Sequence, residues 1–325
     1  MAPGLTAPFA PDPWLLAIAV VLDLLLGDPG YPLHPVRLMG GALSRIEALL
    51  RRMGADGYGG GIALFLVLGS VSLGATYALV RGAALLGPWP ARAAHLFLLY
   101  SLLALGDLLR HGRAVESALR RDDLAGARAA VGRLVGRDTD RMDAGACRRA
   151  VIESQSESLT DGFVSPIFWY VVGGLPGLVV FKVASTMDSM VGYKTPRYLR
   201  FGWCGARLDD LMNWLPARLT WLLLAASALV VPGCAPWAAL RVGWAQHGVL
   251  PSPNSGWPEA ATAGGIRRRL VGPIWSGGHL VTDIWLGDPA DPPAGDGADH
   301  ARARGLAVVC GLITAAGAVA ALLAS

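Results

Sequence analysis

Three carboxylates recur at every fourth residue in the stretch ESQSESLTDG, residues 153–162. On a helix, Glu153, Glu157 and Asp161 would share one face, because positions four residues apart are neighbours on its surface. Like charges at that spacing repel each other, so the pattern favours a bound cation. Mg2+ prefers such oxygen ligands and often shares them with substrate phosphates. The alternative is an ordinary solvated helix face.

A second stretch, residues 185–214, interleaves acids and bases with aromatic side chains. Its cations suit anionic phosphates, and its paired aspartates suit a metal ion. The alternative is a membrane-interface segment with an aromatic belt and basic anchors. Its ionisable and amide residues are Asp188, Lys194, Arg197, Arg200, Arg207, Asp209, Asp210 and Asn213.

Two shorter stretches also combine polar residues with prolines. GDPGYPLHPVR, residues 27–37, contains Asp28, His34 and Arg37 and is otherwise typical of a proline-rich turn. In PSPNSGWPE, residues 251–259, Asn254 and Glu259 bracket a predicted tight turn, and the alternative is an ordinary loop. Nucleotide-binding glycine fingerprints are absent from the sequence, and the four cysteines form no CxxC pair.

The elements that position these stretches are predicted to be membrane helices. The 325 residues are 53% hydrophobic and only 16% charged, against about 25% charged in soluble domains. The mean hydropathy is +0.45. This composition predicts an all-α polytopic membrane bundle. A net charge of +4 is too small to indicate a nucleic-acid partner.

A membrane helix needs about 20 mostly apolar residues. Residues 163–184 have that length, but Gly173, Gly174 and two prolines predict a broken or re-entrant segment. Residues 214–243 are predicted to dip and return around Pro232 and Gly233. The other apolar segments are 13–27, which carries Asp23, 62–80, 93–109 and 306–324.

The basic residues orient the chain, because lysine and arginine favour the cytoplasmic side. Four polar segments hold most of the 28 lysines and arginines, which predicts that all four lie inside; a conventional count of spans would place 185–213 outside. We expect one membrane domain, 1–325, with a cytoplasmic helical insertion over about 110–161 and a flexible loop over about 287–299. The insertion is predicted to contain two short amphipathic helices, the second capped by Asp122. The four segments are 27–61, 110–161, 185–213 and 244–305.

The same polar stretches, in the same order, resemble the CobD/CbiB family, the adenosylcobinamide-phosphate synthases. The resemblance covers nearly the whole chain and departs at Ser158, where the family usually has asparagine. The motifs that carry it are LDLLLGDPGYPLHPVRLMG (22–40), GRDT (136–139), FWYVVGGLPG (168–177), TMDSMVGYK (186–194), FGWCGARLDDLMNWLPARLT (201–220) and SPNSGWPEAATAGG (252–265).

The resemblance implies ATP-dependent amide formation between adenosylcobyric acid, a corrinoid, and aminopropanol or its phosphate. It also implies ATP and Mg2+ as cofactors and a bacterial inner membrane with the active face in the cytoplasm. We expect metal ligands among the six acids Glu153, Glu157, Asp161, Asp188, Asp209 and Asp210. Catalytic roles are expected of Glu157, Asp161, Asp188, Asp210 and Lys194. Substrate or phosphate binding is expected of His34, Arg37, Arg197, Arg207, Asn213, Asn254 and Glu259.

Two alternatives belong to other functional classes. One is a non-catalytic membrane relative that binds a ligand or signals, since a related family is linked to β-lactamase regulation. The other is a corrinoid transporter, for which Asp23 and the broken segment 163–184 are the only indications.

Overall fold

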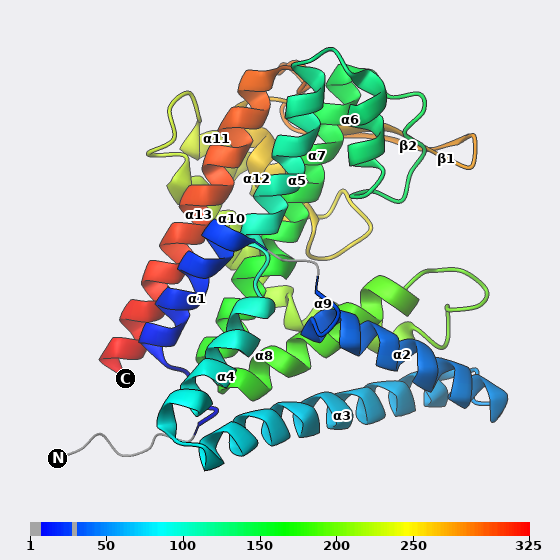
Figure 1. Ribbon diagram of the computed structural model, residues 1–325. Helices are drawn as coiled ribbons and strands as arrows, with labels where there is room; N and C mark the ends of the chain where they lie inside the picture. Colours follow the sequence, from blue (N-terminus) through cyan, green and yellow to red (C-terminus); the bar gives the residue numbers. More distant parts are fainter. Residues whose placement is uncertain (1–7, 28–30) are drawn as a thin grey trace. The chain divides into compact units, whose positions relative to one another are not determined.

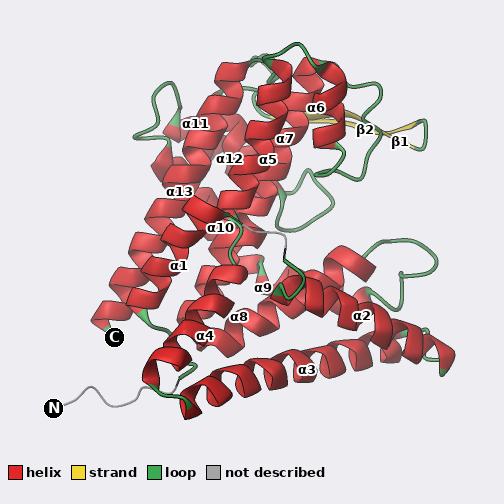
Figure 2. Ribbon diagram, in the orientation of Figure 1, coloured by secondary structure: helices red, strands yellow, loops and turns green. Residues whose placement is uncertain are grey.

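Helices make up nearly all the regular structure of the computed structural model, which describes residues 8–27 and 31–325 (Figures 1 and 2). The predicted all-α polytopic membrane fold is confirmed. Within the described residues, four helical stretches are long and apolar enough to cross a membrane: Tyr58–Leu85, Pro88–Leu119, Ala144–Val191 and Gly297–Ala324.

The chain divides into two compact units. The first comprises Met1–Ala104, Ser165–Asn213 and Ala315–Ser325, and the second comprises Leu105–Val164 and Trp214–Thr314. Each unit holds two of the four polar stretches that the sequence singles out. The single membrane domain expected from the sequence stays a prediction.

Local sequence explains how the helices of the first unit begin and pack. The Asp12 side chain accepts hydrogen bonds from the amides of Trp14 and Leu15, and Pro13 suits the first helical position. Helix α2 runs alongside α3 in Figure 1. The helices are α1 (Pro13–Leu26), α2 (Pro35–Arg52), α3 (Tyr58–Leu85), α4 (Pro88–Ser101), α8 (Ser165–Val191) and α9 (Trp203–Met212).

Helix α8 is interrupted where the sequence predicts a break. Gly174 has φ +60° and ψ −153°, outside the helical region, and Pro176 follows it. The amide of Leu175 donates instead to the carbonyl of Phe9, at 3.0 Å, so the break leaves this amide paired. Any side chain at Gly174 would collide with that carbonyl oxygen. Glycine is therefore required here by both conformation and space.

The second unit contains the predicted amphipathic helices, but its cap differs from the prediction. Asp123, not Asp122, caps α6: its carboxylate accepts from the Gly126 amide at 2.8 Å. Asp122 has φ +57° and occupies the turn before the cap. The helices are α5 (Leu105–Leu119), α6 (Leu124–Val131), α7 (Ala144–Leu159), α10 (Trp214–Ser227), α11 (Pro236–Gln246), α12 (Gly256–Ile266) and most of α13 (Gly297–Ala324).

Two features of the second unit are not predicted from sequence. A π-helical turn, η1 (Thr160–Val164), follows α7 directly. An antiparallel hairpin, β1 (Leu270–Ser276) and β2 (His279–Leu286), lies within the polar segment 244–305. Its turn is Gly277–Gly278, both with positive φ, and both amides donate to the Asp138 carboxylate, at 3.2 and 2.8 Å.

Candidate functional site

In the first unit, the structure brings together three of the predicted acids. Asp188 lies near the end of α8, and Asp209 and Asp210 lie on α9, which packs against α8. Gly205 permits this close approach, because a Cβ there would lie 2.6 Å from Cβ of Met187. The two helices thus set a half-buried carboxylate beside an adjacent acidic pair. We call Asp188, Asp209 and Asp210 the aspartate cluster.

Asp209 is half-buried and is held by a chain of two hydrogen bonds. Its Oδ2 accepts a hydrogen bond from Asn213 Nδ2 at 3.0 Å, and Ser165 Oγ donates in turn to Asn213 Oδ1. Asn213, predicted as a substrate contact, therefore positions Asp209. The other carboxylate oxygen, Oδ1 of Asp209, is buried and has no hydrogen-bond partner among the described residues. A buried acceptor without a partner is costly, so it points to a ligand.

The surroundings of Asp209 oppose its ionisation. Burial, followed by the nearby Asp188 carboxylate, raises the pKa of Asp209 from its usual 3.8 to about 7. Burial also raises the pKa of Asp210, although Arg207 and Lys194 act in the opposite direction. Carboxylates held so close together are stabilised by a cation.

Lys182 on α8 is a member of this site that the sequence interpretation missed. It is buried, and its charge lowers the pKa of Asp209 against the stronger effect of burial. Its signal in the sequence is a lone lysine within the apolar segment 163–184, where ionisable residues are rare and usually functional.

The predicted cations are divided between two environments. Arg207 contacts Asp210 at 3.4 Å, and Lys194 lies exposed in the segment that follows α8. Arg197 instead pairs with Glu47 of α2 at 3.2 Å, so the structure does not bring it to the aspartate cluster. Arg207 and Lys194 are the two predicted cations that act on this cluster.

The stretch 27–37 is described only in part, because Asp28 lies outside the described residues. His34 is the N-cap residue of α2 and is buried, with its ring edge against Tyr31 at a centroid distance of 5.2 Å. Arg37 is exposed on the first turn of α2. Their predicted substrate-binding roles stay predictions.

In the second unit, a group of acids surrounds the start of α12. Glu259, in the first turn of that helix, is buried. Burial, with the carboxylates of Glu157 and Glu153, raises its pKa well above the usual value. Asn254, also buried, precedes the helix in a turn where Ser252 Oγ accepts from the Asn254 amide at 3.2 Å. The stretches 153–162 and 251–259 therefore meet in this unit.

Glu153 is fixed by protein groups on both oxygens. Arg137 donates to one oxygen, and the amide of Val271 donates to the other at 3.0 Å. Arg137 belongs to the GRDT motif but is missed as a partner of Glu153, because sequence spacing does not reveal contacts between a loop and a helix. A carboxylate held this way fits a structural role better than metal ligation. Its predicted metal role stays a prediction.

The prediction that three carboxylates share one α-helical face is correct only for Glu153 and Glu157, both on α7. Glu157 is exposed, whereas Asp161 is half-buried within the π turn η1. A π turn uses i to i+5 hydrogen bonds, so it shifts the following residues around the helix axis. Asp161 therefore does not continue the α-helical face.

Among the described residues, no three acids, histidines or cysteines form a preformed metal cage. Mg2+ does not require one, because it commonly takes one or two carboxylates and completes its shell with water and substrate phosphates. The buried partnerless oxygen of Asp209 and the neighbouring carboxylates match that donor chemistry. The aspartate cluster therefore fits Mg2+.

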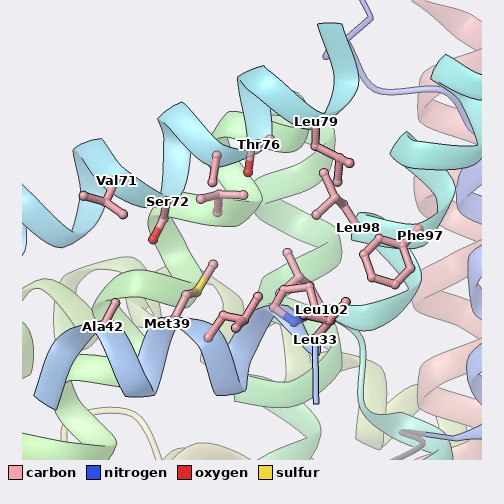
Figure 3. A pocket seen from close by; sticks show the side chains of 14 residues that line it. Leu33, Met39, Ala42, Val71, Ser72, Thr76, Leu79, Phe97, Leu98 and Leu102 are labelled. Carbon is pink, nitrogen blue, oxygen red and sulfur yellow. The ribbon is translucent and has the colours of Figure 1, made fainter. Parts of the chain in front are cut away.

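An apolar cavity of about 340 Å³ also lies in the first unit (Figure 3). Figure 3 shows Ser72 and Thr76 of α3 on the opposite side of the cavity from Met39 of α2. None of the residues shown lining it is ionisable, so this cavity supplies no acid, base or metal ligand.

Comparison with known proteins assigns the family. A family model described as CobD/Cbib protein matches residues 16–309. The chain belongs to the CobD/CbiB family. It is 44% identical over 285 residues to "Cobalamin biosynthesis protein CobD" of Sinorhizobium sp, covering 85% of this chain and 87% of the relative.

Other members of the CobD/CbiB family give a similar picture. The CobD protein of Pelobacter propionicus is 41% identical, covering 86% of each chain. "Cobalamin biosynthesis protein CbiB" of Salmonella typhi is 38% identical, covering 83% of this chain and 86% of the relative. No solved structure matches this chain.

Proposed function

We propose that this protein acts in cobalamin biosynthesis as a membrane-bound carbon–nitrogen ligase. It joins a carboxylate of adenosylcobyric acid to the amine of aminopropanol or aminopropanol phosphate, with consumption of ATP. The names of its relatives support the pathway. The aspartate cluster of the first unit supports the use of ATP with Mg2+. The active face is proposed to be cytoplasmic, on the inner membrane, because ATP is cytosolic.

The reaction needs activation because a free carboxylate has no good leaving group. Transfer of the terminal phosphoryl group of ATP to a carboxylate oxygen gives an acyl phosphate and ADP. The amine then forms the C–N bond, phosphate leaves, and the amine gives up a proton to solvent. Mg2+, when bound, neutralises charge on the phosphates. Asp188 and Asp209 are proposed to hold it, with water and phosphate completing its shell, and Arg207 and Lys194 are proposed to bind phosphate oxygens.

One observation carries this proposal: Asp209 Oδ1 is buried without a hydrogen-bond partner beside two further aspartates. A purely structural carboxylate would be expected to have both oxygens satisfied. A site that exchanges metal and phosphate must keep such an atom available.

The deciding experiment is a reconstituted assay with the purified full chain in lipid. It supplies adenosylcobyric acid, ATP and Mg2+ with each amine in turn, and detects the amide by mass spectrometry. We expect ADP and amide in equal amounts, dependent on Mg2+ and on both organic substrates. If neither amine gives an amide, the ligase proposal is overturned. Corrinoid accumulation in sealed vesicles without ATP or amine would support transport instead.

A further inference from the structure

A basic cavity of about 260 Å³ lies in the second unit, apart from the residues assigned to the reaction. It is formed by the C-terminal half of α5 and the first two turns of α13, with Gly297 and Ala301 leaving room between them. Its polar lining residues are Arg113, Glu116, Ser117, Arg120, His300 and Arg304.

The charge of this cavity is strongly positive. Three guanidinium groups face one carboxylate, and that carboxylate is already neutralised from behind, because Arg148 Nε contacts Glu116 Oε2 at 2.9 Å. Arg113 and Arg304 are exposed and make no hydrogen bond or ion pair within the described part of the chain. The guanidinium fork matches phosphate oxygens in shape and charge.

One cation of the cavity is held by an ion pair, and two other groups favour an anion. Glu116 is buried, and its Oε1 contacts Arg120 Nε at 3.3 Å, which holds that arginine at the cavity. The hydroxyl of Ser117 accepts from Arg121 at 2.7 Å, so its own proton is available for an anion. The N-terminal end of α13 adds the partial positive charge of a helix start.

The membrane explains where such an anion would come from. Helices α5 and α13 both belong to stretches that are long and apolar enough to span a bilayer, Pro88–Leu119 and Gly297–Ala324. Basic pockets between membrane helices at the cytoplasmic end bind phospholipid headgroups. We propose that this cavity binds a phosphate group, supplied by an anionic phospholipid or by free phosphate. This proposal does not rest on the proposed ligase reaction.

The test is a titration of the purified full chain in a zwitterionic detergent by calorimetry. Three probes are compared: dihexanoyl-phosphatidylglycerol, dihexanoyl-phosphatidylcholine and inorganic phosphate. The variant Arg120→Gln/Arg304→Gln is compared with Arg133→Gln, which removes an exposed arginine that does not line the cavity. We expect an anionic probe, phosphatidylglycerol or inorganic phosphate, to bind the wild-type protein. Its Kd should rise at least tenfold in the double variant and less than twofold in Arg133→Gln.

The probes separate the two sources of phosphate. If phosphatidylglycerol binds and inorganic phosphate does not, the cavity is a lipid headgroup site. If inorganic phosphate binds at least as tightly as phosphatidylglycerol, the cavity is a free-phosphate site. The proposal is overturned if neither binds, if phosphatidylcholine binds equally well, or if Arg133→Gln weakens binding as much as the double variant does. If the double variant does not fold, Arg113→Gln replaces it with the same expectation.

Discussion

A single carboxylate oxygen, Oδ1 of Asp209, distinguishes the aspartate cluster from an ordinary ion-pair network. Salt bridges elsewhere in the protein satisfy their carboxylates with arginine, as Glu116 and Glu153 illustrate. Asp209 is instead half-buried beside other acids, and its buried Oδ1 has no hydrogen-bond partner among the described residues. Such an arrangement reduces folding stability in the absence of a ligand.

The first prediction concerns the pH dependence of stability at Asp209. Because the folded state raises its pKa from 3.8 to about 7, the folded state binds the proton more tightly than the unfolded state. Stability should therefore fall as pH rises from about 4 to about 7, by at most roughly 4 kcal/mol. Asp209→Asn removes this loss. In thermal unfolding without metal, the variant should exceed wild type in Tm at pH 8 but not at pH 4, and equal Tm values at pH 8 would contradict it.

The second prediction separates the acids by function. Asp188→Asn should lower amide formation at least 100-fold in the reconstituted assay, because it removes a proposed metal ligand while keeping the side chain's shape. The matched control is Asp56→Asn, which removes an exposed acid that pairs with Arg51 at 3.2 Å, away from the aspartate cluster. Wild-type turnover in Asp188→Asn would remove this residue from the proposed site.

The third prediction concerns the contact between Arg137 and Glu153. Removing one partner of a buried ion pair leaves an uncompensated charge, which costs about 3–5 kcal/mol. Arg137→Met should therefore lower the unfolding free energy by that amount, and adding Glu153→Gln should recover much of it. Arg141→Met is the control, because Arg141 stacks on Trp275, at 4.6 Å from its ring centroid, and makes no contact with Glu153. If Arg137→Met and Arg141→Met lower the unfolding free energy equally, there is no specific stabilising pair between Arg137 and Glu153.

At the scale of elements, the interruption of α8 is the feature that the sequence predicted best. Paired glycines followed by proline mark the position, because proline removes a donor and glycine permits a positive φ. The sequence did not reveal which glycine turns the chain, since that depends on the Phe9 carbonyl from a distant segment.

The difference between Gly173 and Gly174 gives the fourth prediction. Gly174→Ala should destabilise the fold by about 2 kcal/mol or more, because its φ is positive and its space is filled. Gly173→Ala should have little effect, because nothing lies within 4 Å of a Cβ there. Thermal unfolding of the two purified variants provides the measurement, and similar Tm values would contradict the assignment.

The elements that the sequence missed share a physical cause. The π turn at η1 interrupts a helical pattern without proline or glycine at its start, so periodicity alone continues the α-helix through Asp161. The hairpin at 270–286 depends on Gly277–Gly278 being held by Asp138, a residue far away in sequence. The residue that caps α6 is Asp123, one position after the predicted Asp122, and only the backbone geometry decides between the two.

At the scale of the whole molecule, composition predicted the membrane fold, and motif order predicted the family. The buried Lys182 and the partner of Glu153 were not predicted, since tertiary packing decides them. That all four stretches face one side of the membrane stays a prediction.

The fifth prediction tests that arrangement. Glu157 and Lys194 are exposed, one in each unit, and make suitable sites for single cysteines in a chain whose own four cysteines are replaced. Both Glu157→Cys and Lys194→Cys should react with a membrane-impermeant thiol reagent in inverted vesicles and not in right-side-out vesicles. Labelling from opposite sides would end the one-sided model.

The bond between Leu175 and Phe9 has a practical consequence for anyone shortening this protein. The segment from Phe9 to Asp12 also reaches Tyr170, whose hydroxyl accepts from the Asp12 amide at 2.8 Å. Trimming the chain to residue 13 would strip the Leu175 amide of its acceptor in the protein interior, because Leu175 is fully buried. A chain that starts at residue 13 would be expected to give a lower yield of folded protein, although it keeps every residue of the proposed site.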